Sequence, residues 1–80
     1  MHELHLITNA ISDLKKRAND ANTNRVTKIY FRMGEFTEIS ADSLKFHFTE
    51  QSKGTILEGA ELVIEKSPVR ELVLVSFDCE

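Results

Sequence analysis

The first three residues of this sequence, Met1-His2-Glu3, carry groups that are well suited to bind a transition metal. A free terminal amine, the amide nitrogen of His2 and the His2 imidazole can close adjoining chelate rings on one ion. Nitrogen donors in a near-planar arrangement are typical of Ni(II) or Cu(II) sites. The fourth position would fall to the Glu3 amide or carboxylate, to water, or to a group from a partner. Because the donors must lose protons, the affinity should fall as the pH falls. The alternative interpretation is a solvated terminus in which His2 has no ligand role.

Two further histidines lie outside this motif. His5 follows His2 by three residues on the same side of a helix, and it could act as a second ligand or hold a ligand in place. The alternative for His5 is a polar surface residue beside an apolar stripe. For His47, between Phe46 and Phe48, we expect a partly buried, hydrogen-bonded histidine rather than a ligand.

The other reactive side chains do not form a recognisable catalytic pattern. The acidic residues that could do acid–base work are Glu35, Glu38, Asp42 and Glu50. A carboxylate pair needs a pocket that separates two pKa values, and a domain this small seldom encloses one. The serines lack the strained, glycine-flanked turn of a hydrolase nucleophile, and Cys79 has no basic sequence neighbour to activate its thiol. The sequence therefore predicts a protein that is not an enzyme.

The composition is that of one small globular domain, residues 1–80. Hydrophobic residues make up 41% and charged residues 29%, which indicates neither disorder nor a fibrous repeat. The formal net charge of −3 argues against nucleic-acid or anionic-membrane partners, which would need a basic face. The one cysteine cannot make an internal disulfide or a zinc site of several cysteines. Because there is no signal peptide and no apolar run long enough to span a bilayer, we expect a cytoplasmic protein.

Periodicity and capping signals predict two helices. An apolar stripe with spacings of three and four predicts the first helix over residues 3–21. Its members are Leu4, Ile7, Ile11, Leu14, Ala18 and Ala21. Ser40 is a good N-cap for the second helix, and Lys53-Gly54 is a C-terminal stop. Ile39 and Leu44 occupy the two positions of a hydrophobic staple around that cap.

Three strands complete the expected fold. Alternation over residues 25–33 predicts a strand whose core-facing residues are Thr27, Ile29, Phe31 and Met33. Residues 61–65 and 72–79 are the other two strands. The order αβαββ predicts an α+β fold, with two helices packed on one face of a small three-stranded sheet. Because only a few residues around Pro68 and Val69 join the last two strands, we expect them to pair as an antiparallel hairpin.

Several runs of residues along the chain form one recognisable set. The runs are Met1-His2-Glu3-Leu4, Val26-Thr27-Lys28, Met33-Gly34-Glu35, Leu44 with Phe46 and Phe48, Gly54-Thr55, Glu58-Gly59-Ala60-Glu61-Leu62 and Ile64-Glu65. Together they resemble one known family, the HypA/HybF nickel metallochaperones. The resemblance extends over residues 1 to about 66. The family supplies nickel during maturation of [NiFe]-hydrogenase and, in some bacteria, of urease.

The resemblance implies a function and a site. The family's nickel site lies at its Met-His-Glu start, so the resemblance implies Ni(II) ligands at Met1, His2 and Glu3. The implied partners are a HypB-like GTPase and the hydrogenase large subunit. The alternative is a protein-interaction module of the same fold that has lost its metal function.

One departure from the family pattern is large. Family members carry a zinc domain with two CxxC pairs, inserted after the second strand of the sheet. Here Ser67-Pro68-Val69 leads straight into residues 70–80, which look like the strand that returns from that insertion. We therefore expect a nickel-binding domain with no zinc and with the insertion absent around residues 67–69. We expect a monomer, or a dimer in which the last strand is exchanged between chains at a hinge near Pro68.

Overall fold

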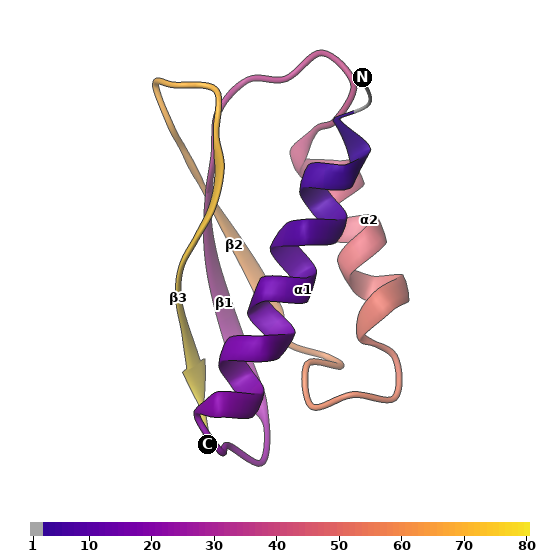
Figure 1. Ribbon diagram of the computed structural model, residues 1–80, viewed down its shortest axis with the longest axis vertical. Coiled ribbons are helices and arrows are strands. Elements are labelled where there is room, and N and C mark those ends of the chain that lie inside the picture. Colours follow the sequence, from indigo (N-terminus) through magenta and orange to yellow (C-terminus); the bar gives the residue numbers. More distant parts are fainter. Residues whose placement is uncertain (1–2) are drawn as a thin grey trace.

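The computed structural model describes residues 3–80 and contains five regular elements (Figure 1). They are α1 (Leu4–Asp20), β1 (Val26–Met33), α2 (Ala41–Ser52), β2 (Glu61–Lys66) and β3 (Leu72–Cys79). The predicted order αβαββ and the α+β class are confirmed. Both helices lie on the same face of the sheet, as predicted, and their apolar sides form one core with it.

The apolar stripe of α1 is buried over its middle turns. The fully buried members of the predicted stripe are Ile7, Ile11, Leu14 and Ala18. Leu4, at the first turn, is 45% exposed, and Ala21 lies beyond the helix as an exposed residue. The 3.6-residue periodicity therefore identifies the buried face correctly, and only the two ends of the predicted stripe remain at the surface.

The central strand β1 departs from strict alternation at its first residues. Ile29, Phe31 and Met33 are buried as predicted. The prediction is wrong for Thr27, which is exposed, whereas Val26 is fully buried. The register with β3 shifts between Val26 and Lys28, and a bulge of this kind reverses which side chains face the core.

Local capping signals place α2 as predicted. The Ser43 N–H donates to Ser40 Oγ at 3.2 Å, and the Ser40 N–H donates to Ser43 Oγ at 2.7 Å. These reciprocal bonds satisfy main-chain groups that a helix start leaves unpaired. The staple residues Ile39 and Leu44 are both buried. At the other end Gly54 adopts a φ of +76°, which glycine tolerates best.

The strand order in the sheet is β2-β1-β3, so the predicted antiparallel hairpin of the last two strands is wrong. β2 pairs in parallel with β1, and β3 pairs with β1 in the antiparallel sense on the other side. The chain reaches β2 from β1 through α2, and a crossover of this kind sets two strands parallel. With β2 and β3 on opposite edges, the short segment between them must cross over the end of β1.

This connector, residues 67–71, is held in place by hydrogen bonds to Met33 and Gly34 at the end of β1. The Ser67 N–H donates to the Met33 carbonyl at 3.1 Å, and the Gly34 N–H donates to the Glu71 carbonyl at 2.8 Å. A Cβ atom on Gly34 would lie 1.8 Å from the carbonyl oxygen of Val69. Glycine is therefore required at position 34, because the main chain of the connector occupies the space of a side chain. Within residues 3–80, no helix is both long and apolar enough to cross a bilayer.

Candidate metal centre

The predicted metal residues Met1 and His2 lie outside the described residues, so the structural account of the site begins at Glu3. Glu3 is the N-cap of α1, and its carbonyl accepts the Leu6 N–H at 2.9 Å. Only 7% of its surface is exposed. The third residue of the predicted metal motif is therefore a buried, charged residue at the N-terminal end of a helix.

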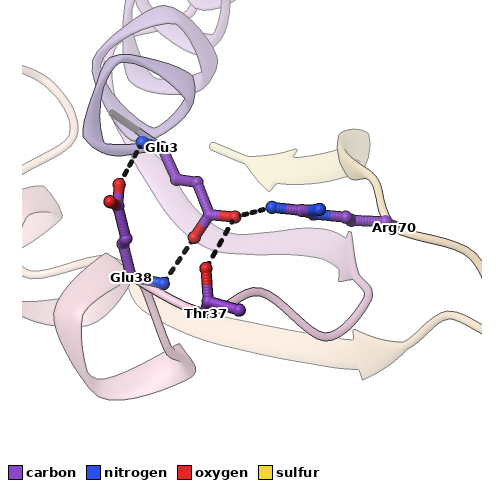
Figure 2. Close-up of polar contacts among 4 residues, drawn as sticks. All are labelled: Glu3, Thr37, Glu38 and Arg70. Carbon is purple, nitrogen blue, oxygen red and sulfur yellow. Dashed lines mark hydrogen bonds and ion pairs between the residues drawn. The ribbon is translucent and has the colours of Figure 1, made fainter. Parts of the chain in front are cut away.

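The Glu3 carboxylate binds groups from two distant segments (Figure 2). It accepts the Glu38 N–H at 2.5 Å and the Thr37 hydroxyl at 3.4 Å, and it forms an ion pair with the Arg70 guanidinium. In return, the main-chain N–H of Glu3 donates to Glu38 Oε1 at 2.8 Å. We call Glu3, Thr37, Glu38 and Arg70 the Glu3 cluster.

The cluster holds Glu3 in its charged form. Burial raises the pKa of this carboxyl, but the Glu38 N–H, the Arg70 guanidinium and the Thr37 hydroxyl lower it, and the net pKa lies below the ordinary value of 4.5. A metal ion that bound a Glu3 oxygen would have to compete with these donors. A metal that bound the Glu3 amide nitrogen would have to replace its proton, and with it the hydrogen bond to Glu38.

Local structure explains why Thr37, Glu38 and Arg70 stand where they do. Thr37 and Glu38 precede the N-cap of α2 in the loop that follows β1, so the capping box and the staple fix their positions. Arg70 lies in the connector, where its guanidinium carbon is 5.6 Å from the centre of the Phe36 ring. Arginine packs well on an aromatic face, and this contact holds the Arg70 side chain against the same loop.

The remaining histidines are placed as surface or half-buried residues of the two helices. His5 is exposed on α1. His47 is partly buried, as expected, and its ring lies edge-on to that of Phe46 with the ring centres 5.4 Å apart. Among residues 3–80, no group of three or more His, Cys, Asp or Glu side chains is arranged to hold a metal ion. A metal site that includes Glu3 would therefore need donors from Met1 and His2.

Two surface hollows adjoin Glu35, one of the acidic residues considered for catalysis. One, of about 400 Å³, lies along the connector and also contacts Lys66 and Arg70. The other, of about 410 Å³, lies between the end of β1 and the start of α2, beside Lys45. Glu35 is the only acidic lining residue in either hollow, and neither is lined by a histidine. The arrangement of acid and histidine that a hydrolase would need is therefore not formed in these hollows.

Sequence reasoning missed the partners of Glu3. The sequence presents Glu38 only as a candidate catalytic acid, places Arg70 in the segment that leads into the last strand, and assigns no role to Thr37. Thr37 and Arg70 lie 34 and 67 residues from Glu3 along the chain, and no local spacing signals such a contact. The contact depends on β3 lying on the opposite edge of the sheet from β2, because that arrangement takes the connector across the end of β1, towards the loop before α2.

The chain is similar to proteins that handle nickel. A family model described as "Hydrogenase/urease nickel incorporation, metallochaperone, hypA" matches residues 1–74. The hydrogenase maturation factor HypA of Chloroflexus aurantiacus strain J-10-fl is 38% identical over 69 residues, which cover 86% of this chain and 60% of that protein. HypA of Caldanaerobacter subterraneus is 34% identical over 79 residues, or 99% of this chain and 64% of that protein.

A solved structure shares the fold. The solution structure of the Ni metallochaperone HypA from Helicobacter pylori superimposes with a TM-score of 0.65 at 13% identity, covering 95% of this chain and 72% of that one. The chain spans about 60% of the length of the curated relatives named above. The match to the family model and the match to the Helicobacter pylori structure therefore both extend over nearly the whole of this chain.

Proposed function

This chain belongs to the HypA family of hydrogenase/urease nickel-incorporation metallochaperones, and we propose that it binds Ni(II) at its N-terminal residues and releases it during hydrogenase maturation. The family match includes the Met-His-Glu start. The observation that carries the proposal is the anchoring of Glu3, whose side chain and main chain are both held by the Glu3 cluster. Residue 3, which directly follows His2 in the sequence, is thereby held in place.

Each residue of the motif has a distinct role in this proposal. His2 supplies the principal side-chain ligand, and the Met1 amine and the His2 and Glu3 amide nitrogens are further donors. Nitrogen donors of this kind suit Ni(II). The Glu3 carboxylate orients or tunes the site. Nickel is the cargo of this protein, and a site made from a chain terminus suits transfer because it is not enclosed by a cage of side chains.

Delivery to a client is the finer part of the proposal. We expect the recipient to be the hydrogenase large subunit and the assisting protein to be a HypB-like GTPase, with urease as a further client. The exposed side of α1 is the docking surface that lies nearest to Glu3, and amphipathic helices present contact residues at spacings of three and four.

A nickel titration of His2→Ala tests the metal-binding part directly. Calorimetry on the untagged protein should show tight Ni(II) binding for the parent and loss of that binding for His2→Ala. His47→Ala is the matched control, because it removes an imidazole from α2, and it should bind nickel as the parent does. Equal affinity with and without His2 would overturn the proposal and favour the protein-interaction module instead.

A further inference from the structure

We propose that the Glu3 cluster and bound nickel exclude each other, so that nickel loading releases Arg70 from the start of α1. In the nickel-free protein the cluster joins α1 to the loop before α2 and to the connector (Figure 2). Binding of Ni(II) to Glu3 breaks these contacts. This inference rests on the proposed function, and it adds a way in which nickel loading changes the surface of the molecule.

Nickel and Glu38 compete for the main-chain nitrogen of Glu3. This nitrogen carries one proton, and it donates that proton to Glu38 Oε1 at 2.8 Å. Because a metal takes the place of a proton on its ligand, a metal-bound nitrogen has no hydrogen bond to donate. The Glu38 carboxylate would then face a nitrogen without a proton and must move away from it.

Nickel also competes with protein donors for both oxygens of the Glu3 carboxylate. Oε1 accepts the Glu38 N–H at 2.5 Å, whereas Oε2 accepts the Thr37 hydroxyl at 3.4 Å and pairs with Arg70. A Ni(II) ion on this carboxylate takes the place of a donor or lies beside the Arg70 guanidinium, and two cations so close together repel each other. Nickel therefore weakens the cluster whether it binds the nitrogen or the carboxylate of Glu3.

The part of the connector that nickel releases is the side chain of Arg70. The two ends of the connector are held by main-chain hydrogen bonds at the end of β1, and neither of these bonds involves Glu3. The contact of the guanidinium with the Phe36 ring also remains, but a contact of this kind at a partly exposed site is weak. Nickel loading should thus free the Arg70 side chain and leave the sheet unchanged.

Contacts that exist only without nickel oppose nickel binding. If nickel weakens the cluster, the cluster weakens the affinity for nickel by the same factor, because coupling between two binding events is reciprocal. A hydrogen bond to a charged group typically contributes an amount that corresponds to about tenfold in an equilibrium constant. Loss of one such contact should therefore raise the affinity for Ni(II).

The first test compares Arg70→Ala with a matched arginine variant. Arg17 forms an ion pair with Asp13 at 3.2 Å, and its side chain is 55% exposed, close to the 61% of Arg70. In calorimetric titrations Arg70→Ala should bind Ni(II) about tenfold more tightly than the parent, whereas Arg17→Ala should bind as the parent does. Circular dichroism establishes that each variant is folded. Equal or weaker binding by folded Arg70→Ala would overturn the inference.

Two Glu38 variants isolate the contact with the main chain. Both remove the negative charge, which by itself lowers the affinity for a cation. Glu38→Gln keeps an oxygen that can accept the Glu3 N–H, and Glu38→Ala does not. Glu38→Ala should therefore bind Ni(II) about fivefold more tightly than Glu38→Gln, the factor that corresponds to one neutral hydrogen bond. Equal affinities, or tighter binding by Glu38→Gln, would contradict the competition at the Glu3 nitrogen.

Cleavage by trypsin measures the release of Arg70 directly. Trypsin must take an arginine or lysine side chain into its specificity pocket, so the Arg70–Glu71 bond should be cut slowly while Arg70 is paired. Nickel should speed this cleavage about tenfold in the parent, because proteolysis follows the population of the open form. The Lys53–Gly54 bond at the end of α2 is the internal control, and its cleavage should not change. In His2→Ala, nickel should affect neither bond.

The outcomes distinguish this inference from the proposed function. If nickel binding requires His2 but changes neither the cleavage after Arg70 nor the affinity of folded Arg70→Ala, the inference is wrong and the nickel site stands. Nickel would then bind without displacing the contacts of Glu3. If His2→Ala binds nickel as the parent does, the proposed function fails, and this inference fails with it.

Discussion

The two ends of the molecule, which lie far apart along its longest axis, are closed by different kinds of contact (Figure 1). At one end, a nearly buried carboxylate, Glu3, joins α1 to the loop before α2 and to the connector. At the other end, two hydrogen bonds link the main chain of Glu80 to the turn before β1. The Glu80 N–H donates to the Arg25 carbonyl at 2.9 Å, and the Thr23 hydroxyl donates to the main-chain oxygen of Glu80 at 2.8 Å.

The two ends differ in how precisely their neighbouring segments must be placed. A buried charge is stable only when partners neutralise and hydrogen-bond it, so the Glu3 end needs three segments in fixed positions. Exposed hydrogen bonds are individually weak, because water can replace them. The Glu3 end, where the family motif lies, therefore requires its neighbouring segments in a fixed arrangement. The Glu80 end tolerates changes in that arrangement.

The largest effect should come from extending the chain at its two ends. Four residues added before Met1, none of them histidine, convert the terminal amine into an amide and carry the new amine away from His2. This extension should abolish tight Ni(II) binding even though His2 is intact. The same four residues added after Glu80 should leave nickel binding unchanged. Calorimetric titration of both extended proteins checks this contrast. Tight binding by the N-terminally extended protein would mean that the amine is not a donor.

The next largest contrast should come from replacing one glycine at each end, Gly34 and Gly54, with alanine. A Cβ atom in Gly34→Ala would meet the Val69 carbonyl oxygen at 1.8 Å, so the connector must move, and the free energy of unfolding should fall by about 3 kcal/mol. In Gly54→Ala the new Cβ meets nothing within 4 Å, and only the positive φ opposes it, at about 1 kcal/mol. Denaturant unfolding measures both changes. Equal losses would show that the connector can shift freely.

Gly34 and the connector that crosses it show which parts of the fold could be predicted from the sequence. Helix bounds, the Ser40 cap and the strand segments followed from local periodicity and capping, which act within a few residues. The pairing of β3 depended instead on which strand occupies the centre of the sheet, and the shortness of the connector favoured the wrong answer. A crossing over Gly34 is as short as a hairpin, so loop length alone does not distinguish the two.

The candidate site likewise has one part that could be predicted from the sequence and one part that could not. The motif Met1-His2-Glu3 could be identified because its donors are adjacent in sequence and the family resemblance supports them. The residues that hold Glu3 could not, because Thr37, Glu38 and Arg70 reach it only through tertiary structure. Their side chains are ordinary surface types, and burial of Glu3 is what gives them a role.

Acid should weaken the Glu3 end selectively. The pKa of Glu3 is lowered in the folded protein, so between the folded and the unfolded pKa the unfolded chain binds more protons, and stability rises with pH in that window. The contribution is present above about pH 4.5, the ordinary value, and it is lost as the pH falls through the folded pKa. Unfolding midpoints measured from pH 7 to pH 3 should therefore fall less steeply for Glu3→Gln than for the parent.

The matched control for this titration is an exposed carboxylate elsewhere in the chain. Glu50 forms an ion pair with Lys53 at 3.1 Å, and its side chain is 51% exposed. Exposed pairs of this kind contribute little to stability, so Glu50→Gln should follow the acid profile of the parent. If Glu3→Gln also followed it, the ionised cluster would not contribute to stability.

The smallest effect should come from the Glu80 end. The Thr23 hydroxyl donates to the main-chain oxygen of Glu80 at 2.8 Å and, more weakly, to the Arg25 carbonyl at 3.2 Å. Thr23→Ala removes both bonds and should lower the free energy of unfolding by about 0.5–1 kcal/mol, whereas Thr23→Ser keeps the hydroxyl and should lose less. Nickel affinity should be the same in both. A loss above about 2 kcal/mol, which exceeds the range for an ordinary exposed hydrogen bond, would mean that this end is also rigidly specified. The contrast between the two ends would then reduce to the charge that Glu3 carries.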